Sequence, residues 1–274
     1  MFDQVKESAE FIKSKIPDNA KHAIILGTGL GGFADNLIHR ETVLYKDIPH
    51  FHASTVQSHD GKLIFGFIKK APILVMSGRL HYYEGYSAKE VTFPIRVLKE
   101  LGIDHIIVTN AAGGINPHYS EGDIVMINDH INMMPDHPLR GQNDQNFGPR
   151  FPDMLDAYDL ASIKTFELLA KKSNTRLHTG VYLGLQGPSL ETPAEYKMAH
   201  ILGADLVGMS TIPEVIVARH QNMKVSAFSI VSNVCFPASK LSKTTVEDVI
   251  KTVNQSAGRL ENLLLDYFTH ISDE

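Results

Sequence analysis

The chain of 274 residues is 43% hydrophobic and 21% charged and has a net charge of −5 at pH 7, which is typical of a globular protein with a sizeable core. That charge excludes the basic surface of a nucleic-acid-binding protein, and no apolar run is long enough to span a membrane. The single cysteine, Cys235, excludes internal disulfides, and the acidic opening segment does not fit a signal peptide, so we expect a cytoplasmic protein.

Apolar periodicity predicts strands and helices that alternate along the whole chain. Strands are expected at 22–26, 63–68, 73–76, 106–108, 124–128, 180–183 and 228–231. Helices are expected at 2–16, at 87–102, at 156–171 and at 246–268, with two further helix starts at Thr192 and Thr211. Alternation of this kind predicts a single α/β domain over 1–274, in which helices flank a mixed, mostly parallel sheet.

Three of these helices begin with a capping box, in which a Ser or Thr is followed three residues later by Glu. The boxes start at Ser87, Thr192 and Thr211, and the last two have proline in the first turn. Pro94 should kink the first of these helices or delay its start. The polar segment 132–152 is rich in Pro and Gly, and a loop of that length is usually functional or interfacial.

Three of the apolar strands run directly into small residues. These segments, which we expect to be turns, are 27–32, 109–114 and 232–233. Ligands in α/β sheets bind at the carboxyl ends of the strands, and small residues there let backbone N–H groups approach an anion. The pattern therefore predicts an anion-binding site.

The turn at 27–32 also matches the dinucleotide fingerprint G-x-G-x-x-G, and Asp47 follows at about the distance expected of a ribose-binding acid. Only residues 33–40 separate this turn from the next apolar segment, which is too short for a full crossover helix. A dinucleotide-binding fold is therefore not favoured. A tight turn that binds no ligand is about as well supported by this segment alone.

Polar residues near other strand ends are candidates for binding the anion. Arg79 and His81 follow the strand at 73–76, and the donor fork of an arginine suits phosphate. Ser210 lies just before Thr211, where N–H groups and the helix dipole attract anions. An arginine at a strand end is, taken singly, more often a solvated surface residue, and it is the glycine turns at the other strand ends that favour an anion site here.

Three further residues could either have a purely structural role or contact a ligand. Glu191 precedes Thr192, where it either favours the helix dipole or accepts hydrogen bonds from a ligand. Asn233 can recognise an amide-like edge, because its side chain both donates and accepts. His59 lies in a segment that a surface turn explains more simply. No histidines or cysteines have metal-ligand spacing, so we expect no metal.

Several longer motifs, taken in order, resemble those of the trimeric purine nucleoside phosphorylases, from about Ala23 to the final helix. They are Gly-Thr-Gly-Leu-Gly-Gly at 27–32, Gly-Arg-Leu-His-Tyr-Tyr-Glu-Gly at 78–85, Val-Thr-Asn-Ala-Ala-Gly-Gly at 108–114, Gly-Pro-Ser-Leu-Glu-Thr at 187–192 and Val-Gly-Met-Ser-Thr-Ile-Pro-Glu-Val at 207–215. The resemblance implies the nucleoside phosphorylase fold and the reversible phosphorolysis of a purine nucleoside to free base and ribose 1-phosphate, a step of purine salvage. It implies inorganic phosphate as co-substrate and no cofactor.

The same resemblance implies roles for individual residues. Those implied to contact phosphate are Thr28, His59, Arg79, His81, the backbone N–H of Ala111, and Ser210. Those implied to contact the ribose are Tyr83 and Met209, and those implied to contact the purine are Glu191, Asn233 and Leu190. Catalysis would depend on Asn233, Glu191 and His81. Phe151 would reach into the site of a neighbouring subunit, which implies a homotrimer.

These implied roles agree with the chemistry of the reaction. Negative charge grows on the purine as its bond to C1′ breaks, and Asn233 can stabilise that charge around N7 and O6, with one such donor worth roughly 3 kcal/mol. A phosphate positioned below C1′ serves as the nucleophile. Glu191 can accept from N1–H of a 6-oxopurine but not from adenine, and mismatches of this kind can cost a factor of roughly 10⁴ in selectivity. We therefore expect inosine and guanosine to be preferred over adenosine.

Two positions depart from the family pattern. Leu190 stands where the family often has Phe, and the usual His for the ribose 5′-hydroxyl is replaced by Lys243 or Val246. A valine would suit an apolar 5′ substituent, as in the related 5′-methylthioadenosine phosphorylases, but the residues implied to contact the base argue against that substrate. A 5′-methylthioadenosine or xanthosine phosphorylase of the same family is the alternative. An NAD-dependent dehydrogenase would leave Arg79 and Glu191 without a role. A non-catalytic nucleoside-binding protein would not need a separate phosphate pocket.

Overall fold

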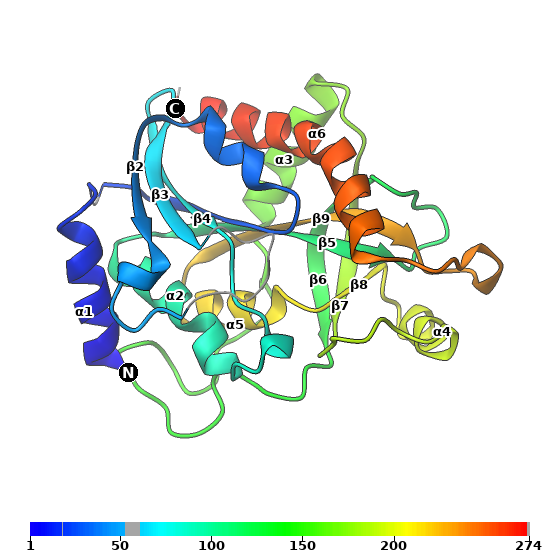
Figure 1. The fold of residues 1–274 in the computed structure, drawn as a ribbon, viewed down its shortest axis with the longest axis horizontal. Coiled ribbons are helices and arrows are strands. Elements are labelled where there is room, and N and C mark those ends of the chain that lie inside the picture. The colour runs from blue at the N-terminus through cyan, green and yellow to red at the C-terminus, as the bar shows by residue number, and fades with distance from the viewer. Residues whose placement is uncertain (18, 53–60, 273–274) are drawn as a thin grey trace.

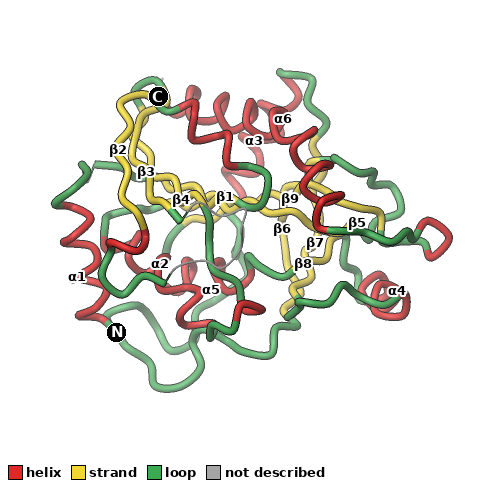
Figure 2. Tube along the Cα trace, in the orientation of Figure 1, coloured by secondary structure: helices red, strands yellow, loops and turns green. Residues whose placement is uncertain are grey.

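The computed structural model describes residues 1–17, 19–52 and 61–272. Within these ranges nine strands form one mixed sheet in the order β2-β3-β4-β1-β5-β8-β7-β6-β9, and β5 also pairs with β9 (Figures 1 and 2). The strands are β1 His22–Leu26, β2 Ile38–Leu44, β3 Lys62–Ile68, β4 Ala71–Ser77, β5 His105–Gly114, β6 Ile124–Asn132, β7 Leu177–Gly184, β8 Leu206–Gly208 and β9 Lys224–Val234. The α-helices are α1 Phe2–Lys13, α2 Ala88–Glu100, α3 Leu160–Lys172, α4 Pro193–Ile201, α5 Ile212–His220 and α6 Val246–Ser272. The predicted single α/β domain with a mixed sheet flanked by helices is confirmed.

The centre of the sheet is parallel and buried on both faces. Strands β4, β1, β5 and β9 run in the same direction, so their carboxyl ends meet at one edge. In Figure 1, α3 and α6 lie on one side of the sheet, and α2 and α5 lie on the other. Helices on both faces explain why the central strands are continuous apolar runs and not alternating ones.

The expectation of turns at 109–114 and 232–233 is wrong, because both segments continue strands. β5 pairs with β9 as far as Gly114 and Val234. Because β9 also ends the strand order β5-β8-β7-β6-β9, the pairing of β9 with β5 closes these five strands into a ring. The small residues of β5 are needed because neighbouring side chains lie close to this strand, and not because the chain turns here. A Cβ on Gly113 would lie 2.6 Å from Sγ of Cys235, a distance that real Cβ atoms essentially never show.

The turn after β1 brings its backbone against β5. The N–H of Gly27 donates to Oγ1 of Thr109 at 3.0 Å, and a Cβ on Gly27 would lie 2.6 Å from the Thr109 carbonyl oxygen. Only glycine allows this approach. A short 3₁₀ helix at Gly31–Asn36 and the antiparallel β2 follow, so the crossover helix that a dinucleotide-binding unit needs is absent from this described segment. The described structure therefore does not support a dinucleotide-binding dehydrogenase.

Two of the three capping boxes are confirmed. The side-chain oxygens of Ser87 and Thr192 each accept a hydrogen bond from the backbone N–H three residues later. Pro94 lies inside α2 and does not delay its start. α3 begins later than predicted, after the N-cap Asp159. At Thr211 the side chain caps nothing and φ is 70°, so that prediction is wrong.

The long loop predicted at 132–152 is present. Between 133 and 159 the described chain forms neither a helix nor a strand. The predicted loop start, Asn132, is instead the last residue of β6, because β6 pairs with β7 beyond the expected strand end. None of the helices in the described part of the chain is long and apolar enough to cross a membrane.

Candidate active site

A cavity of about 430 Å³ lies at the carboxyl ends of β4, β1, β5 and β9. The predicted site residues that line it are Thr28, Arg79, His81, Tyr83, Ala111, Leu190, Glu191, Met209, Ser210 and Asn233. Of the two positions considered for the 5′ end, Val246 is among the lining residues described, and Lys243 is not. His59 lies outside the described residues. The fold thus brings together residues from strand ends and loops that are far apart in the sequence.

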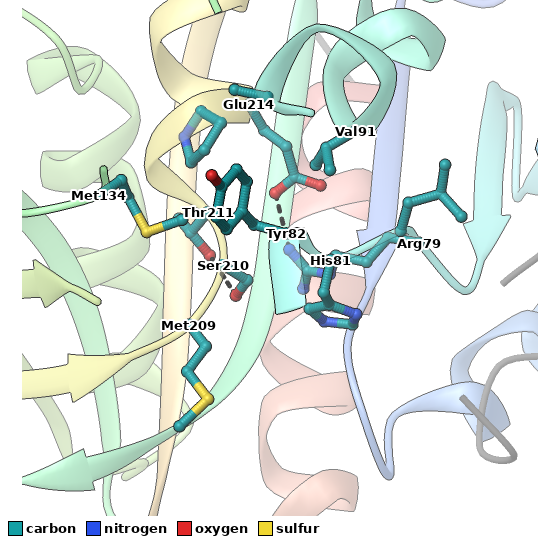
Figure 3. A pocket seen from close by; sticks show the side chains of 12 residues that line it. Arg79, His81, Tyr82, Val91, Met134, Met209, Ser210, Thr211 and Glu214 are labelled. Atoms are coloured by element: carbon teal, nitrogen blue, oxygen red, sulfur yellow. Dashed lines mark hydrogen bonds and ion pairs between the residues drawn. The ribbon is translucent and has the colours of Figure 1, made fainter. Parts of the chain in front are cut away.

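Arg79 enters this cavity from the segment that follows β4. Its side chain is 3% exposed, and its Nη1 donates to Oε2 of Glu214 at 2.7 Å, as Figure 3 shows. Its Nη2 donates to the backbone carbonyl of Thr109 on β5. Two partners on different elements fix the plane of the guanidinium. Because an arginine fork is matched to planar and tetrahedral oxyanions, a fixed fork is a preorganised anion donor.

Glu214 has a role that the capping-box interpretation missed. It lies in the first turn of α5, a helix whose residues from Ile212 to Ala218 are all buried. The Glu214 side chain is also 3% exposed, so its charge depends on Arg79 and not on water. Breaking a buried pair of this kind leaves an uncompensated charge, which is strongly destabilising.

The segment that leads into α5 is strained. Thr211 adopts φ 70° and ψ −54°, and the N–H of Ile212 donates to the carbonyl of Ser210 at 2.8 Å, which is the geometry of a γ-turn. Oγ1 of Thr211 accepts from Nδ2 of Asn110 at 2.9 Å instead of capping the helix. A β-branched residue in this conformation costs roughly 1–3 kcal/mol, and such strain concentrates at ligand sites. The turn sets Ser210 into the cavity wall beside the N-terminus of α5.

His81 is held in one orientation by its neighbours. Its Nδ1 lies 3.1 Å from Oε1 of Glu84, which also accepts from the backbone N–H of His81 at 2.7 Å. The ring stacks on Tyr83 with centroids 4.7 Å apart. Burial lowers the pKa of His81, and the adjacent Glu84 opposes that shift. These contacts present the imidazole beside Arg79, Met209 and Ser210, as Figure 3 shows.

Glu191 and Asn233 form a second polar group in the same cavity. The narrower recess shown in Figure 3, which Arg79 and Ser210 line, does not include either of them. Burial raises the pKa of Glu191, and a hydrogen bond from Tyr196 opposes that rise. Nδ2 of Asn233 donates to Sγ of Cys235 at 3.1 Å, and its Oδ1 accepts from the Ser232 hydroxyl at 2.7 Å. The cavity therefore offers anion donors together with an amide and a carboxylate.

Phe151 does not line this cavity. It is 85% exposed in the segment between β6 and α3, and it borders a second cavity of about 490 Å³ together with Arg140, Arg150 and Met154. The Arg150 guanidinium lies 5.6 Å from the Phe151 ring centroid. A phenylalanine this exposed is available for contact with another chain.

Metal ligation has no support within the described ranges, where no three His, Cys, Asp or Glu residues are grouped as a metal site would require. Three residues of the site were not predicted: Tyr196 lines the cavity, Glu214 lines the narrower recess beside Arg79, and Cys235 contacts Asn233. Glu214 could have been found from the sequence, because it is the one charged residue in the otherwise apolar run 212–218. If such a helix is buried, its acid needs a partner. Tyr196 and Cys235 carry no such local signal.

Comparisons with known proteins agree with this geometry. The sequence model of the phosphorylase superfamily matches residues 21–269. Purine nucleoside phosphorylase 1 of Bacillus subtilis is 48% identical over 233 residues, which are 85% of this chain and 86% of that protein. The purine nucleoside phosphorylase of Rattus norvegicus is 43% identical over 269 residues, covering 96% of this chain and 93% of that protein.

Solved structures show the same fold. Isoform 2 of the purine nucleoside phosphorylase of Schistosoma mansoni, in complex with cytosine and ribose-1-phosphate, superposes with a TM-score of 0.93 at 37% identity, over 98% of this chain and 96% of that one. A Schistosoma mansoni purine nucleoside phosphorylase in complex with adenosine superposes with a TM-score of 0.90 at 39% identity, over 96% of this chain and 95% of that one. The chain therefore belongs to the phosphorylase superfamily and, within it, to the purine nucleoside phosphorylases.

Proposed function

We propose that this protein is a pentosyltransferase of purine salvage that catalyses the reversible phosphorolysis of 6-oxopurine (deoxy)ribonucleosides. Inosine and guanosine would be converted to free base and (deoxy)ribose 1-phosphate. The observation that carries the proposal is a single cavity lined both by Arg79 and Ser210 and by Glu191 and Asn233. The purine nucleoside phosphorylases among its relatives, and the complex of one of them with ribose-1-phosphate, support the same activity.

Phosphate would bind where the donors converge. Arg79, His81 and Ser210 line one recess, and Thr28 and the backbone at Ala111 line the adjoining wall of the main cavity. A phosphate oxygen would attack C1′ while the bond from C1′ to the purine breaks and its electron pair passes to the base. The reaction needs no covalent enzyme intermediate, no cofactor and no metal. Positioning of the phosphate and stabilisation of the charged centres would supply the rate enhancement.

The purine would be held by Glu191 and Asn233, beside Leu190. Asn233 would stabilise the charge that grows around N7 and O6 of the leaving base. Glu191 would accept from N1–H of hypoxanthine or guanine. Adenine has no proton at N1, so its lone pair would face the carboxylate, and the resulting mismatch favours the 6-oxopurines. Tyr83 and Met209 would contact the ribose between the two groups, since both line the cavity.

The whole chain, 1–274, would act as one domain of a cytoplasmic homotrimer in which Phe151 of each subunit reaches a neighbour's site. The 85% exposure of Phe151 supports this role, because a side chain so apolar is stabilised when another chain covers it. Light scattering would give the mass of a trimer. Phe151→Ala should weaken nucleoside binding, and a monomer with full activity would contradict this part of the proposal.

A coupled assay of inosine with and without phosphate tests the activity. Hypoxanthine release that requires phosphate is the expected result. Release without phosphate would indicate hydrolysis, and binding of inosine without release would favour a non-catalytic nucleoside-binding protein. Turnover of adenosine at a rate comparable to that of inosine would contradict the assigned base specificity.

A substrate with an apolar 5′ group is the second candidate. The observation that favours it is Val246, which lines the cavity with Val249 at the start of α6 and offers no hydrogen bond to a 5′-hydroxyl. Comparing inosine with 5′-deoxyinosine tests it. If the 5′-deoxy substrate reacts with similar kcat/KM, the 5′ end is read by apolar contact, whereas a large loss would show that a polar partner exists.

A further inference from the structure

Two side chains, Tyr196 and Cys235, lie between the two residues proposed to hold the purine. Tyr196 lines the same cavity as Glu191 and packs with Cys235 in one buried cluster, and its phenol interacts with both the carboxylate and the thiol. Sγ of Cys235 in turn accepts from Nδ2 of Asn233 at 3.1 Å. Glu191 precedes α4, Tyr196 lies on α4, and the other two residues belong to β9 and the segment just after it. The chain of contacts Glu191–Tyr196–Cys235–Asn233 therefore ties two separate elements together beside the cavity.

The thiol occupies a space that the fold keeps open for it. Cys235 is 1% exposed, and a Cβ on Gly113 of β5 would come within 2.6 Å of Sγ. Burial raises the pKa of the Cys235 thiol to about 11, so at neutral pH it is protonated and can donate as well as accept. Tyr196 is also buried, so neither partner of this contact can be replaced cheaply by water.

The hydrogen-bond capacity of Asn233 shows what this arrangement does. A carboxamide has two N–H donors and an oxygen with two lone pairs. Cys235 takes one donor at 3.1 Å, and the Ser232 hydroxyl takes one lone pair at 2.7 Å. One N–H and one lone pair then remain on this side chain, which lines the cavity. This pair matches the O6 acceptor of a 6-oxopurine and an N7 that is protonated as the base departs.

From these contacts we infer that Tyr196 and Cys235 are positioning residues for base recognition, which orient Glu191 and Asn233 as one unit. The inference rests on the proposed function, because it concerns the site assigned to the purine. Neither residue touches the reacting atoms. Tyr196 restrains the Glu191 carboxylate beside it, and Cys235 fixes which way the Asn233 amide faces.

Single-atom and isosteric variants test this inference. Tyr196→Phe deletes only the hydroxyl, Cys235→Val removes the polar contact at similar volume, and Cys235→Ser restores a donor and acceptor. Tyr119→Phe is the matched control, because the Tyr119 hydroxyl is also buried and donates to the Thr179 carbonyl at 2.9 Å outside the cavity lining. For each variant, kcat and the KM values for inosine, adenosine and phosphate would be measured, together with Tm.

Tyr196→Phe should raise the KM for inosine about tenfold, narrow the preference for inosine over adenosine, and leave the KM for phosphate within twofold. Cys235→Val should lower kcat about tenfold, and Cys235→Ser should recover most of that loss. Tyr119→Phe should change Tm alone. Variants that lose Tm while keeping wild-type kinetic constants, or that change the KM values for inosine and phosphate equally, would overturn the inference. An inactive wild-type protein would instead refute the proposed function itself.

Discussion

Replacing Glu214 with alanine tests the buried ion pair that fixes Arg79. The Arg79 Nη1 and Glu214 Oε2 atoms are 2.7 Å apart, and both side chains are 3% exposed, so solvent cannot compensate for the loss of the carboxylate. Removing one partner from a buried pair costs about 3–5 kcal/mol. For a domain of this size each kcal/mol corresponds to about 2–4 °C, so Tm should fall by about 6–20 °C.

Differential scanning calorimetry or urea denaturation would measure this loss. The matched control is Asp35→Ala, which removes the partner of Arg40 from an ion pair that is 2.9 Å long but largely exposed. Exposed pairs contribute about 0–1 kcal/mol, so this control should barely move Tm. Glu214→Gln keeps an acceptor oxygen and should lose less than Glu214→Ala. If Glu214→Ala were as stable as the Asp35→Ala control, the pair would not organise the anion end of the cavity.

Four further outcomes are expected. Arg79→Lys should raise the KM for phosphate about tenfold or more, because an ammonium cannot reproduce the fork, and an unchanged KM for phosphate would place the anion elsewhere. Asn233→Ala should lower kcat by about 10²–10³ through the lost donor at the leaving base, and wild-type turnover would disprove that role. Val246→His should raise kcat/KM for inosine relative to 5′-deoxyinosine, whereas an unchanged ratio would remove Val246 from the 5′ end. Burial lowers the pKa of His105 to about 3 from an ordinary 6.5, so the unfolded chain binds more protons and stability falls as pH drops from 6.5 toward 3. Between pH 7 and pH 5 the urea-derived unfolding free energy should fall by about 2 kcal/mol more in the wild type than in His105→Gln, and parallel pH profiles would contradict this.

Much of the fold follows from local patterns in the sequence. The strand at 22–26 and the capped helix starts at Ser87 and Thr192 were predictable, because burial on both faces and short-range capping leave a direct mark on neighbouring residues. The extension of β5 through 109–114 was not predictable, since it depends on register with β9, a strand more than a hundred residues later. Small residues alone do not distinguish a turn from a crowded strand.

In the candidate site, too, local sequence patterns identify some residues, but contacts between distant parts of the chain are not predictable. Arg79 and Ser210 could be identified as anion donors from their positions at element ends. The partners that orient the site could not, because they are set by tertiary contacts. Thr211 looks like a helix cap, yet its hydroxyl is held by Asn110, which is 101 residues away along the chain. The contact of Cys235 with Asn233 likewise depends on the space that Gly113 leaves open.

A crystal structure of the protein with hypoxanthine and sulfate would test the central claim most directly. We expect both molecules in one cavity, with the base within hydrogen-bond distance of Glu191 and Asn233 and the sulfate beside Arg79 and Ser210. Hypoxanthine and sulfate bound in separate places, or a cavity that takes up neither of them, would contradict it.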